Sequence, residues 1–509
     1  MTDHREHTRR IAINTLMLYV RMLVMMFLGL FTSRIVLEAL GENDFGVYNV
    51  IGGVVGMFTV ISGSLTGAVS RFITFEIGKG DSGNLNKVYS TAVNIQFAIS
   101  LIVILLAEPI GLWFIDNEMT IDPSRIPAAR YVLHFSLLAF IFNLLSVPQM
   151  AMITAHEKMT AYAYIGILDG VLRFSVALLI CSTSSDRLVL YSALMALSVL
   201  VVRFAYGWYS RSRFKDCRYR LVYDRGLLKE MFSFAGWDFI GVSSGVLRDQ
   251  GGNVLINIFF GTAVNAARGV AVQLSGAVQG FVTNFMTAVS PQITKSYASG
   301  DHDYMFSLIR KSARMSYYLL FVLTLPVFFT TDFLMNLWLK DVPEYSVLFV
   351  QLFLVFSLGE SLSRPLITAL LATGRIRNYQ LAVGGLQLMN LPVSYVLLKN
   401  GMGPEVTIIV SIVISHVCLF VRLFLFNSLT GFSVSSFTRR VYLNVAAMTA
   451  AALVLPLLLM SIAPDGVAGF MIKACVAFLS AVMAVLFVGC SRVERCELWT
   501  MFVNRFSRE

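Results

Sequence analysis

Long apolar segments alternate with short polar turns along the whole chain. Each apolar segment has about 20–28 residues, the length that an α-helix needs to cross the hydrocarbon core of a bilayer. The longest turn, 209–228, has about 20 residues and is rich in Arg and Lys. The pattern predicts an all-α polytopic membrane protein with about fourteen transmembrane helices. The predicted spans are 11–37, 46–73, 88–114, 130–153, 160–181, 188–208, 231–260, 264–293, 306–330, 345–371, 379–399, 405–427, 441–462 and 468–490.

Two distant stretches of the chain share one pattern. "SRFITFEIGKGD" (70–81) and "SPQITKSYASGD" (290–301) have Ser, Ile-Thr and Gly-Asp in the same register, at a shift of 220. Other positions align at a shift of 220 or 217, and they are Gly41 with Gly261, Gly56 with Gly276, Pro148 with Pro365, Ala155 with Ala372, Lys158 with Arg375 and Tyr162 with Tyr379. The alignment indicates that helices 7–12 repeat helices 1–6.

The repeat also predicts how the chain is organised. Six helices per copy is an even number, so both copies cross the membrane in the same sense. We therefore expect them to be related by an axis along the membrane normal, the parallel-repeat design of many transporters. The predicted segments are an N-terminal six-helix lobe (1–208), a basic cytoplasmic linker (209–230), a C-terminal six-helix lobe (231–427), and two extra helices with a cytoplasmic tail (428–509).

Composition and charge agree with a membrane protein. The 509 residues are 57% hydrophobic and only 14% charged, too few charges to cover a soluble protein of this length. If both termini are cytoplasmic, roughly 25 Lys and Arg lie in cytoplasmic segments and about 5 on the other side. The net charge of +10 is then explained by cytoplasmic loops. We expect membrane lipids as partners and no nucleic acid.

Several kinds of chemistry have no support in the sequence. The six cysteines are scattered without a CxxC pair, so we expect neither a disulfide nor a metal site. GxxxxGK[ST] and HExxH motifs are missing, and no cofactor is expected. Glu42 and Asp44 mimic the ExD dyad of membrane glycosyltransferases that use lipid-linked donors. Such enzymes generally need a sizeable extracytoplasmic loop, which this chain lacks.

The predicted helix 264–293 carries small and polar residues on one face, and its counterpart 46–73 carries a matching set. Two interpretations remain open. The small residues either let helices pack closely or line a water-filled cavity between the two copies. Gln and Arg in the second helix favour the cavity. The candidate cavity-lining residues are Asn49, Thr59, Thr66, Gln273, Gln279 and Thr283.

Many cations within the predicted spans are arginines. Each deep arginine facing lipid would cost about 2.5–3.5 kcal/mol, and five would together cost more than about 12 kcal/mol, as much as a whole folding stability. They must therefore face protein or water. Arg203 and Arg422 lie nearer span ends, where we expect them to snorkel. The five others are Arg21, Arg173, Arg248, Arg268 and Arg364.

Some of these arginines have an acidic neighbour. Two pairs are four residues apart on one helical face, which predicts structural ion pairs. These pairs are Asp169 with Arg173 and Glu360 with Arg364. Asp249 adjoins Arg248. Neither Arg21 nor Arg268 has an acid within two helical turns of it in its own span, and these two arginines are the leading candidates for a functional role. Because arginine stays charged when desolvated and binds phosphate through two N–H groups, such a cavity favours a phosphate-bearing cargo.

Four stretches carry a resemblance to a known family. They are "NTLMLYVRMLVMMFLGLFTSRIVLEALGENDFGVYNVIGGVVGMF" (14–58), "AHEKMTAYAYIGIL" (155–168), "FSFAGWDFIG" (232–241) and "ALLATGRIRNY" (369–379). These residues resemble the bacterial Wzx-type flippases of O-antigen and capsule repeat units, within the multidrug/oligosaccharidyl-lipid/polysaccharide (MOP) exporter superfamily. The resemblance runs over nearly the whole chain.

The resemblance implies a MATE-like bundle of two six-helix lobes plus two helices in the bacterial inner membrane. It implies transfer of an undecaprenyl-diphosphate-linked oligosaccharide for lipopolysaccharide-type polymers from the inner to the outer leaflet, with no bond made or broken. The implied partners are this substrate, the polysaccharide polymerase and the chain-length machinery. Related flippases hold the diphosphate with arginines on helices 1, 2 and 8. The corresponding candidates here are Arg21, Arg71 and Arg268, with Arg248 as a fourth.

Two alternatives remain open. A cation-coupled multidrug antiporter of the same superfamily generally has a coupling carboxylate on helix 1 or helix 7. Helix 1 has none in its core, whereas helix 7 offers Asp238 and Asp249 as candidates for ion coupling. The other alternative is a membrane-embedded polysaccharide polymerase or ligase.

Overall fold

The computed structural model describes residues 2–495, except 57, 81, 118, 120, 184–185, 223, 340–341, 460–465 and 493. These residues form helices and short turns, without a strand, which confirms the all-α prediction. The longer helices are α1 (Thr2–Gly56), α2 (Thr59–Lys79), α3 (Ser82–Asn117), α4 (Ile126–Ala155), α5 (Met159–Cys181), α6 (Arg187–Arg213), α7 (Arg225–Ala298), α8 (His302–Phe329), α10 (Ser346–Ala372), α11 (Arg377–Leu388), α12 (Asn390–Lys399), α13 (Val406–Thr430), α15 (Leu443–Leu459) and α16 (Val467–Ala484).

Shorter helical turns connect them. They are η1 (Pro123–Arg125), η2 (Lys215–Cys217), α9 (Thr331–Trp338), α14 (Val434–Phe437), and the π-helical turns η3 (Thr438–Tyr442) and η4 (Val485–Gly489).

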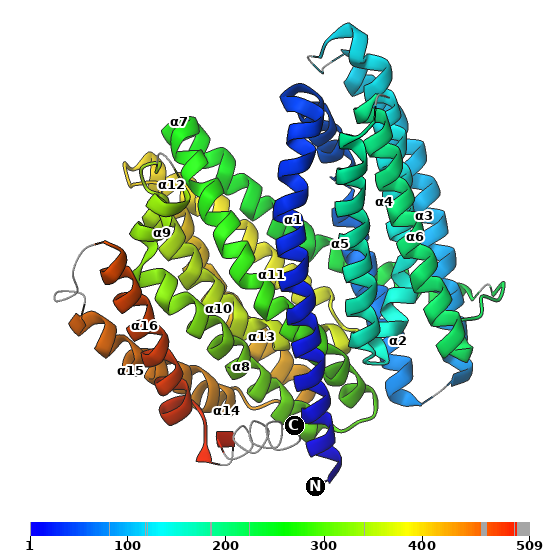
Figure 1. Ribbon diagram of the computed structural model, residues 1–509. Helices are drawn as coiled ribbons and strands as arrows, with labels where there is room; N and C mark the ends of the chain where they lie inside the picture. The colour runs from blue at the N-terminus through cyan, green and yellow to red at the C-terminus, as the bar shows by residue number, and fades with distance from the viewer. Residues whose placement is uncertain are drawn as a thin grey trace, which may run out of the picture. The chain divides into compact units, whose positions relative to one another are not determined.

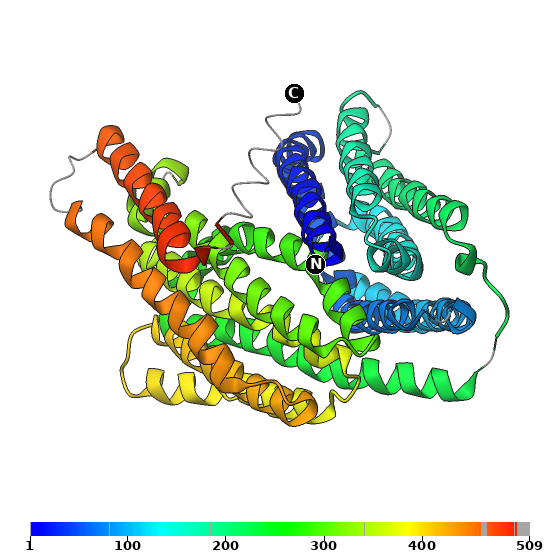
Figure 2. The same ribbon diagram turned by 90° about the horizontal axis from the view of Figure 1, so that it is seen from below.

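The chain divides into two compact units. Unit 1 comprises Met1–Ser243 and Thr287–Asp301, and unit 2 comprises Ser244–Met286 and His302–Glu509. In unit 1, α4 packs on α3 and α6, and α1 packs on α5 (Figure 1). In unit 2, α10 packs on α8 and α13, while α16 packs on α15 and α8 (Figure 2). The four sequence segments proposed above are a different division and stay a prediction.

Both of the longest helices are interrupted by a glycine. Gly41 in α1 has φ 75° and ψ 168°, and Gly261 in α7 has φ 81° and ψ −172°. This backbone region is open almost only to glycine. The two positions are 220 residues apart, the shift at which the sequence repeats. Each glycine separates two of the predicted spans. Helix α7 contains both 231–260 and 264–293, and α1 contains 11–37 and the first part of 46–73.

The repeat is also visible in turns and packing. Gly80 and Gly300, 220 residues apart, end equivalent helices with φ of 75° and 78°. Pro148 in α4 and Pro365 in α10 lie at the shift of 217. Gly78 is the counterpart of Ala298, and a Cβ added at Gly78 would lie 2.8 Å from the Ala298 Cβ. Two equivalent positions of the repeat therefore approach closely within unit 1.

Eleven segments of the described chain are long and apolar enough to cross a membrane. They correspond to eleven of the predicted spans, so the protein is a multi-pass membrane protein. The other three predicted spans, 46–73, 231–260 and 264–293, are not among the eleven. Spans 231–260 and 264–293 lie within α7, whereas 46–73 is divided between the end of α1 and the start of α2. The small and polar residues of 264–293 lower its mean hydropathy.

Candidate functional site

Arg268 is a buried cation held by uncharged oxygens in unit 2. It is 5% exposed. Its Nε donates to Asn253 Oδ1 at 2.6 Å, and one terminal nitrogen donates to the Asp249 carbonyl at 3.1 Å. The guanidinium lies 5.3 Å from the centre of the Phe353 ring. Glycine at position 252 leaves room for the guanidinium, because a Cβ there would lie 2.9 Å from an Arg268 nitrogen.

Arg268 has no directly bound counter-ion among the described residues, and the nearby Asp249 carboxylate is engaged by Arg248. A guanidinium has five N–H donors, and the two hydrogen bonds above use only part of them. A buried charge of this kind is costly unless an anion binds it. The functional role of Arg268 stays a prediction.

Arg21 occupies a comparable position in unit 1. Its guanidinium stacks over the Tyr162 ring, 4.5 Å from the ring centre. Gly166 lies beside its stem, where an added Cβ would be 2.8 Å from Arg21 Cδ. The side chain is half-buried, and among the described residues no acid pairs with it. The aromatic contact orients the cation and leaves its N–H edge unused, since cation–π attraction acts on the ring face.

The two other candidate arginines have different surroundings. Arg248 Nε donates to Asp249 Oδ1 at 2.9 Å, so this cation already has a carboxylate partner. Arg71 lies against aromatic rings of unit 1, with its guanidinium 4.6 Å from the centre of Phe72 and 5.7 Å from that of Phe234. Arg21 and Arg268 therefore remain the stronger candidates.

The predicted cavity-lining residues bond mostly within their own helices. Asn49, Gln273 and Thr283 are exposed, and Asn49 donates to Phe45 O at 2.9 Å. Thr66 Oγ1 donates to Ser62 O at 2.7 Å. Gln279 bonds between helices, because its Nε2 donates to Ser357 Oγ at 2.8 Å. The Thr59 side chain lies outside the described residues. The lining role of all six stays a prediction.

The two candidate coupling carboxylates also differ. Asp238 is 8% exposed and lies against α2, where a Cβ added at Gly67 would be 3.1 Å from Asp238 Oδ2. Asp249 is exposed and is engaged by Arg248. A buried carboxylate is the better candidate for a proton or ion carrier, which favours Asp238.

Of the two predicted ion pairs, the structure contains one. Arg173 Nε donates to Asp169 Oδ1 at 2.9 Å. Within the described residues, Glu360 and Arg364 form no ion pair, because Arg364 is exposed while the half-buried Glu360 faces Arg422 and Arg248.

The prediction that the Arg422 side chain snorkels toward the membrane surface is wrong. Arg422 is 2% exposed, and its NH1 donates to Ser363 Oγ at 3.0 Å. Packing of α13 against α10 encloses it, which helix periodicity alone does not reveal.

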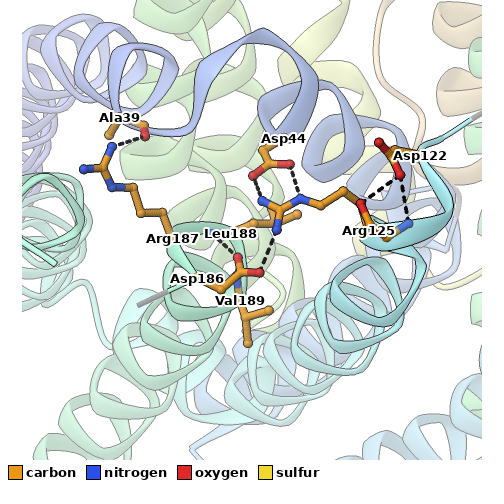
Figure 3. A network of polar contacts seen from close by, with 9 residues as sticks. Ala39, Asp44, Asp122, Arg125, Asp186, Arg187, Leu188 and Val189 are labelled. Atoms are coloured by element: carbon orange, nitrogen blue, oxygen red, sulfur yellow. Dashed lines mark hydrogen bonds and ion pairs between the residues drawn. The ribbon is translucent and has the colours of Figure 1, made fainter. Parts of the chain in front are cut away.

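Arg125 connects three segments of unit 1 beyond the kink in α1 (Figure 3). Its Nε donates to Asp44 Oδ1 at 2.9 Å, and its NH1 donates to Asp186 Oδ2 at 2.8 Å. Asp186 also caps α6 by accepting from Leu188 N at 3.1 Å. Asp44 lies three residues after Gly41, so this network fixes the chain where it leaves the kink. The Asp44 carboxylate, one half of the ExD mimic, therefore has a structural partner.

The sequence and the fold are similar to those of known proteins. The family model described as "Polysaccharide biosynthesis protein" matches residues 11–297. The uncharacterized membrane protein EpsK of Bacillus subtilis is 20% identical over 302 residues, and the match spans 58% of each chain.

Solved transporter structures share the fold. A MATE transporter in the straight conformation is 13% identical, with a TM-score of 0.71 over 85% of this chain and 97% of that chain. A MOP superfamily transporter from Pyrococcus furiosus, whose binding pocket is described as reversed in polarity, is 12% identical, with a TM-score of 0.70 over 84% and 96%. The predicted kinship is confirmed by the family match and by this fold. The chain belongs to the polysaccharide biosynthesis protein family and has the fold of the MOP superfamily transporters.

Proposed function

We propose that this protein is a flippase for an undecaprenyl-diphosphate-linked oligosaccharide. It moves the lipid-linked saccharide from the inner to the outer leaflet of the bacterial cytoplasmic membrane, with both termini of the chain in the cytoplasm. The partners proposed for it are the polymerase and the chain-length machinery that consume the product. No bond is made or broken in the transfer.

The observation that carries this proposal is the buried guanidinium of Arg268, which forms no ion pair among the described residues. It is 5% exposed, and the atoms that hold it are an amide oxygen and a carbonyl oxygen. Diphosphate supplies the anionic oxygens that such a cation lacks, and a guanidinium can bind them through two parallel N–H groups. Arg21, with its N–H edge unused beside Tyr162, offers a second phosphate ligand.

The mechanism follows from these side chains. Each of the two arginines contacts the diphosphate during the transfer, which lowers the cost of moving two phosphates through an apolar layer. The polyprenyl tail stays in lipid throughout. Alternating access, as in other repeat-built transporters, exposes the headgroup to one side and then to the other. The saccharide needs only weak polar contacts, for which residues such as Asn49 and Gln273 are available.

The test is leaflet transfer of a lipid-linked oligosaccharide in liposomes that contain the purified protein. Arg21→Ala and Arg268→Ala are expected to lower the transfer rate by tenfold or more, and Arg→Lys at either position to restore it only in part because Lys lacks the paired N–H geometry. Arg34→Ala is the matched control for Arg21. It lies on the same helix and pairs with Glu38 at an exposed site, so it should transfer at the parental rate.

Arg364→Ala is the control in unit 2, because its side chain is exposed and forms no ion pair among the described residues. Equal thermal midpoints in detergent establish that the variants fold. Parental transfer by both Arg21→Ala and Arg268→Ala would refute the proposed phosphate role.

The buried carboxylate of Asp238 supports a second candidate, a cation-coupled drug antiporter. That function predicts resistance to cationic dyes that is lost in Asp238→Asn and retained in Arg268→Lys. The flippase proposal predicts the opposite in the liposome assay: Asp238→Asn should keep the transfer rate, and Arg268→Lys should lower it.

A further inference from the structure

Unit 2 contains a cleft of about 320 Å³ that neither the family nor the proposed transfer explains. Ser307, Arg310, Lys311 and Arg314 line one side, at the spacing that places residues on one face of α8. Arg439 and Arg440 of η3 and Asn444 of α15 line the other side. The cleft therefore brings together five cations from two parts of the chain more than 120 residues apart.

Few acids neutralise these cations. Arg314 forms an ion pair with Glu494. In the described part of the chain, no carboxylate pairs with Arg310, Lys311, Arg439 or Arg440. Like charges at this spacing on a helix repel one another. Four cations that have no ion pair among the described residues therefore surround one opening, which is the electrostatic arrangement of a site for a polyanion.

The walls of the cleft are held in place by uncharged contacts. The Tyr318 hydroxyl bonds with Asn444 Oδ1, and Asn444 Nδ2 donates to Gly489 O at 3.3 Å. The Arg310 guanidinium lies 5.9 Å from the centre of the Phe432 ring. Arg439 and Arg440 belong to a π-helical turn, a form that occurs frequently at functional sites.

Exposed apolar residues adjoin the cationic ones. Leu443, next to Asn444, is 56% exposed, and Phe487, two residues before Gly489, is 61% exposed. In the predicted orientation, the start of α8 and the turn before α15 are on the cytoplasmic side. Basic pockets between transmembrane helices on that side bind phosphorylated lipid headgroups. An apolar rim beside a cationic cleft matches a lipid, with its phosphates in the cleft and its chains along the rim.

We propose that this cleft binds a lipid whose headgroup carries two phosphate groups, at the level of the inner leaflet. Two phosphates match four uncompensated cations better than one does. Cardiolipin and a polyprenyl diphosphate share this chemistry, and the experiment below separates them. The inference does not depend on the proposed flippase activity, because it concerns binding at a place remote in sequence from Arg21 and Arg268.

The test uses the purified full-length protein in detergent, titrated separately with cardiolipin, undecaprenyl diphosphate, phosphatidylcholine and inorganic diphosphate. Bound lipid is counted by native mass spectrometry, and the thermal midpoint is followed in parallel. Cardiolipin or undecaprenyl diphosphate should bind and raise the midpoint, and phosphatidylcholine should not. The two-phosphate lipid that binds more tightly is identified as the ligand of the cleft. The triple variant Arg310→Gln, Arg439→Gln and Arg440→Gln should weaken that binding by tenfold or more.

The matched control is the triple variant Arg211→Gln, Arg213→Gln and Arg218→Gln. It removes three exposed arginines from the end of α6 and the connection that follows it in unit 1, and it should bind the lipid with parental affinity. Because Arg439 and Arg440 are exposed, Arg439→Glu with Arg440→Glu provides a second variant that leaves packing intact and should abolish binding.

Three results would overturn the proposal. They are parental affinity in the first triple variant, an equal loss in the control triple variant, and binding of inorganic diphosphate as tight as that of either lipid. Loss of lipid binding with unchanged saccharide transfer would leave the inference intact and separate it from the flippase assay.

Discussion

Glu157 has a left-handed backbone conformation, and the equivalent position in the other copy of the repeat is a glycine. It has φ 59° in the turn between α4 and α5. At the shift of 217, its counterpart is Gly374, which has φ 74° in the turn between α10 and α11. A residue with a Cβ loses about 1–2 kcal/mol in this left-handed region. Contacts made by the Glu157 side chain must therefore offset the strain.

Those contacts lie within unit 1. Lys295 Nζ, near the end of α7, donates to Glu157 Oε1 at 2.6 Å, and Gln292 Nε2 donates to Oε2 at 3.1 Å. The side chains of Lys295 and Glu157 are 25% and 11% exposed, so the pair is only partly screened by water. Hydrogen bonds to a charged group contribute about 1.5–3 kcal/mol each, before the cost of desolvation.

These magnitudes predict an order of stabilities. Glu157→Ala keeps the strain and loses the ion pair, so it should lower the free energy of unfolding by about 2–3 kcal/mol. Glu157→Gly loses the same contacts but relieves the strain, so its loss should be smaller by about 1 kcal/mol. Gly374→Ala introduces the strain without any new contact and should cost about 1 kcal/mol.

The assay is equilibrium unfolding of the purified protein in mixed micelles, with Lys295→Met included to complete a double-mutant cycle with Glu157→Gln. The coupling energy expected between the two residues is about 1.5 kcal/mol. Equal stabilities of Glu157→Ala and Glu157→Gly would refute the argument from backbone strain. A coupling energy within about 0.3 kcal/mol of zero would refute the argument from the ion pair.

Three further predictions concern other parts of the chain. Gly41→Ala and Gly261→Ala should each lower the free energy of unfolding by about 1–3 kcal/mol because both glycines occupy a region closed to alanine, whereas Gly46→Ala, which has open space around it, should not. His156 lies in the turn after α4 and stacks on Phe214, and burial lowers its pKa. Because the folded protein favours the neutral imidazole, the free energy of unfolding should fall as the pH drops below about 6.5. The His156→Phe variant should show a smaller decrease over the same pH range. Burial raises the pKa of the Cys217 thiol to about 12, so in a variant whose only cysteine is Cys217 maleimide labelling at pH 8 should be about a thousandfold slower in the folded than in the unfolded protein.

The repeat was the part of the fold that the sequence predicted best. A backbone position with positive φ favours glycine whatever its tertiary contacts, so such positions leave a mark in the sequence. Four of the glycines aligned by the repeat have positive φ, and they are Gly41, Gly261, Gly80 and Gly300. Hydropathy was sufficient for eleven spans but not for the small and polar helices, because a helix that avoids lipid does not need an apolar surface. The apolar pattern of the sequence predicted those helices as spans, and the repeat supports that prediction independently.

The candidate site shows where reasoning from helical spacing ends. Asn253, the main partner of Arg268, lies 15 residues away, on the other side of the Gly261 kink. A straight helix would hold the two side chains far apart, since 15 residues rise by about 22 Å. The kink turns the chain back and brings them within 2.6 Å. The same limitation applies to Arg422 and Ser363, which meet only because α10 and α13 pack together.

The pair of Glu157 and Lys295 also shows how the two copies of the repeat have diverged. At the shift of 220, the counterpart of Lys295 is Phe75, and the counterpart of Glu157 is Gly374. The symmetric equivalent of the ion pair would therefore join phenylalanine with glycine and carry no charge. Phe75 instead packs near Tyr297, with ring centres 6.3 Å apart. The first copy has a strained turn at Glu157 together with an ion pair, while the second copy has an unstrained turn at Gly374. Because the counterparts carry no charge, this difference makes the end of α7 the one that responds to salt and to substitution at Glu157.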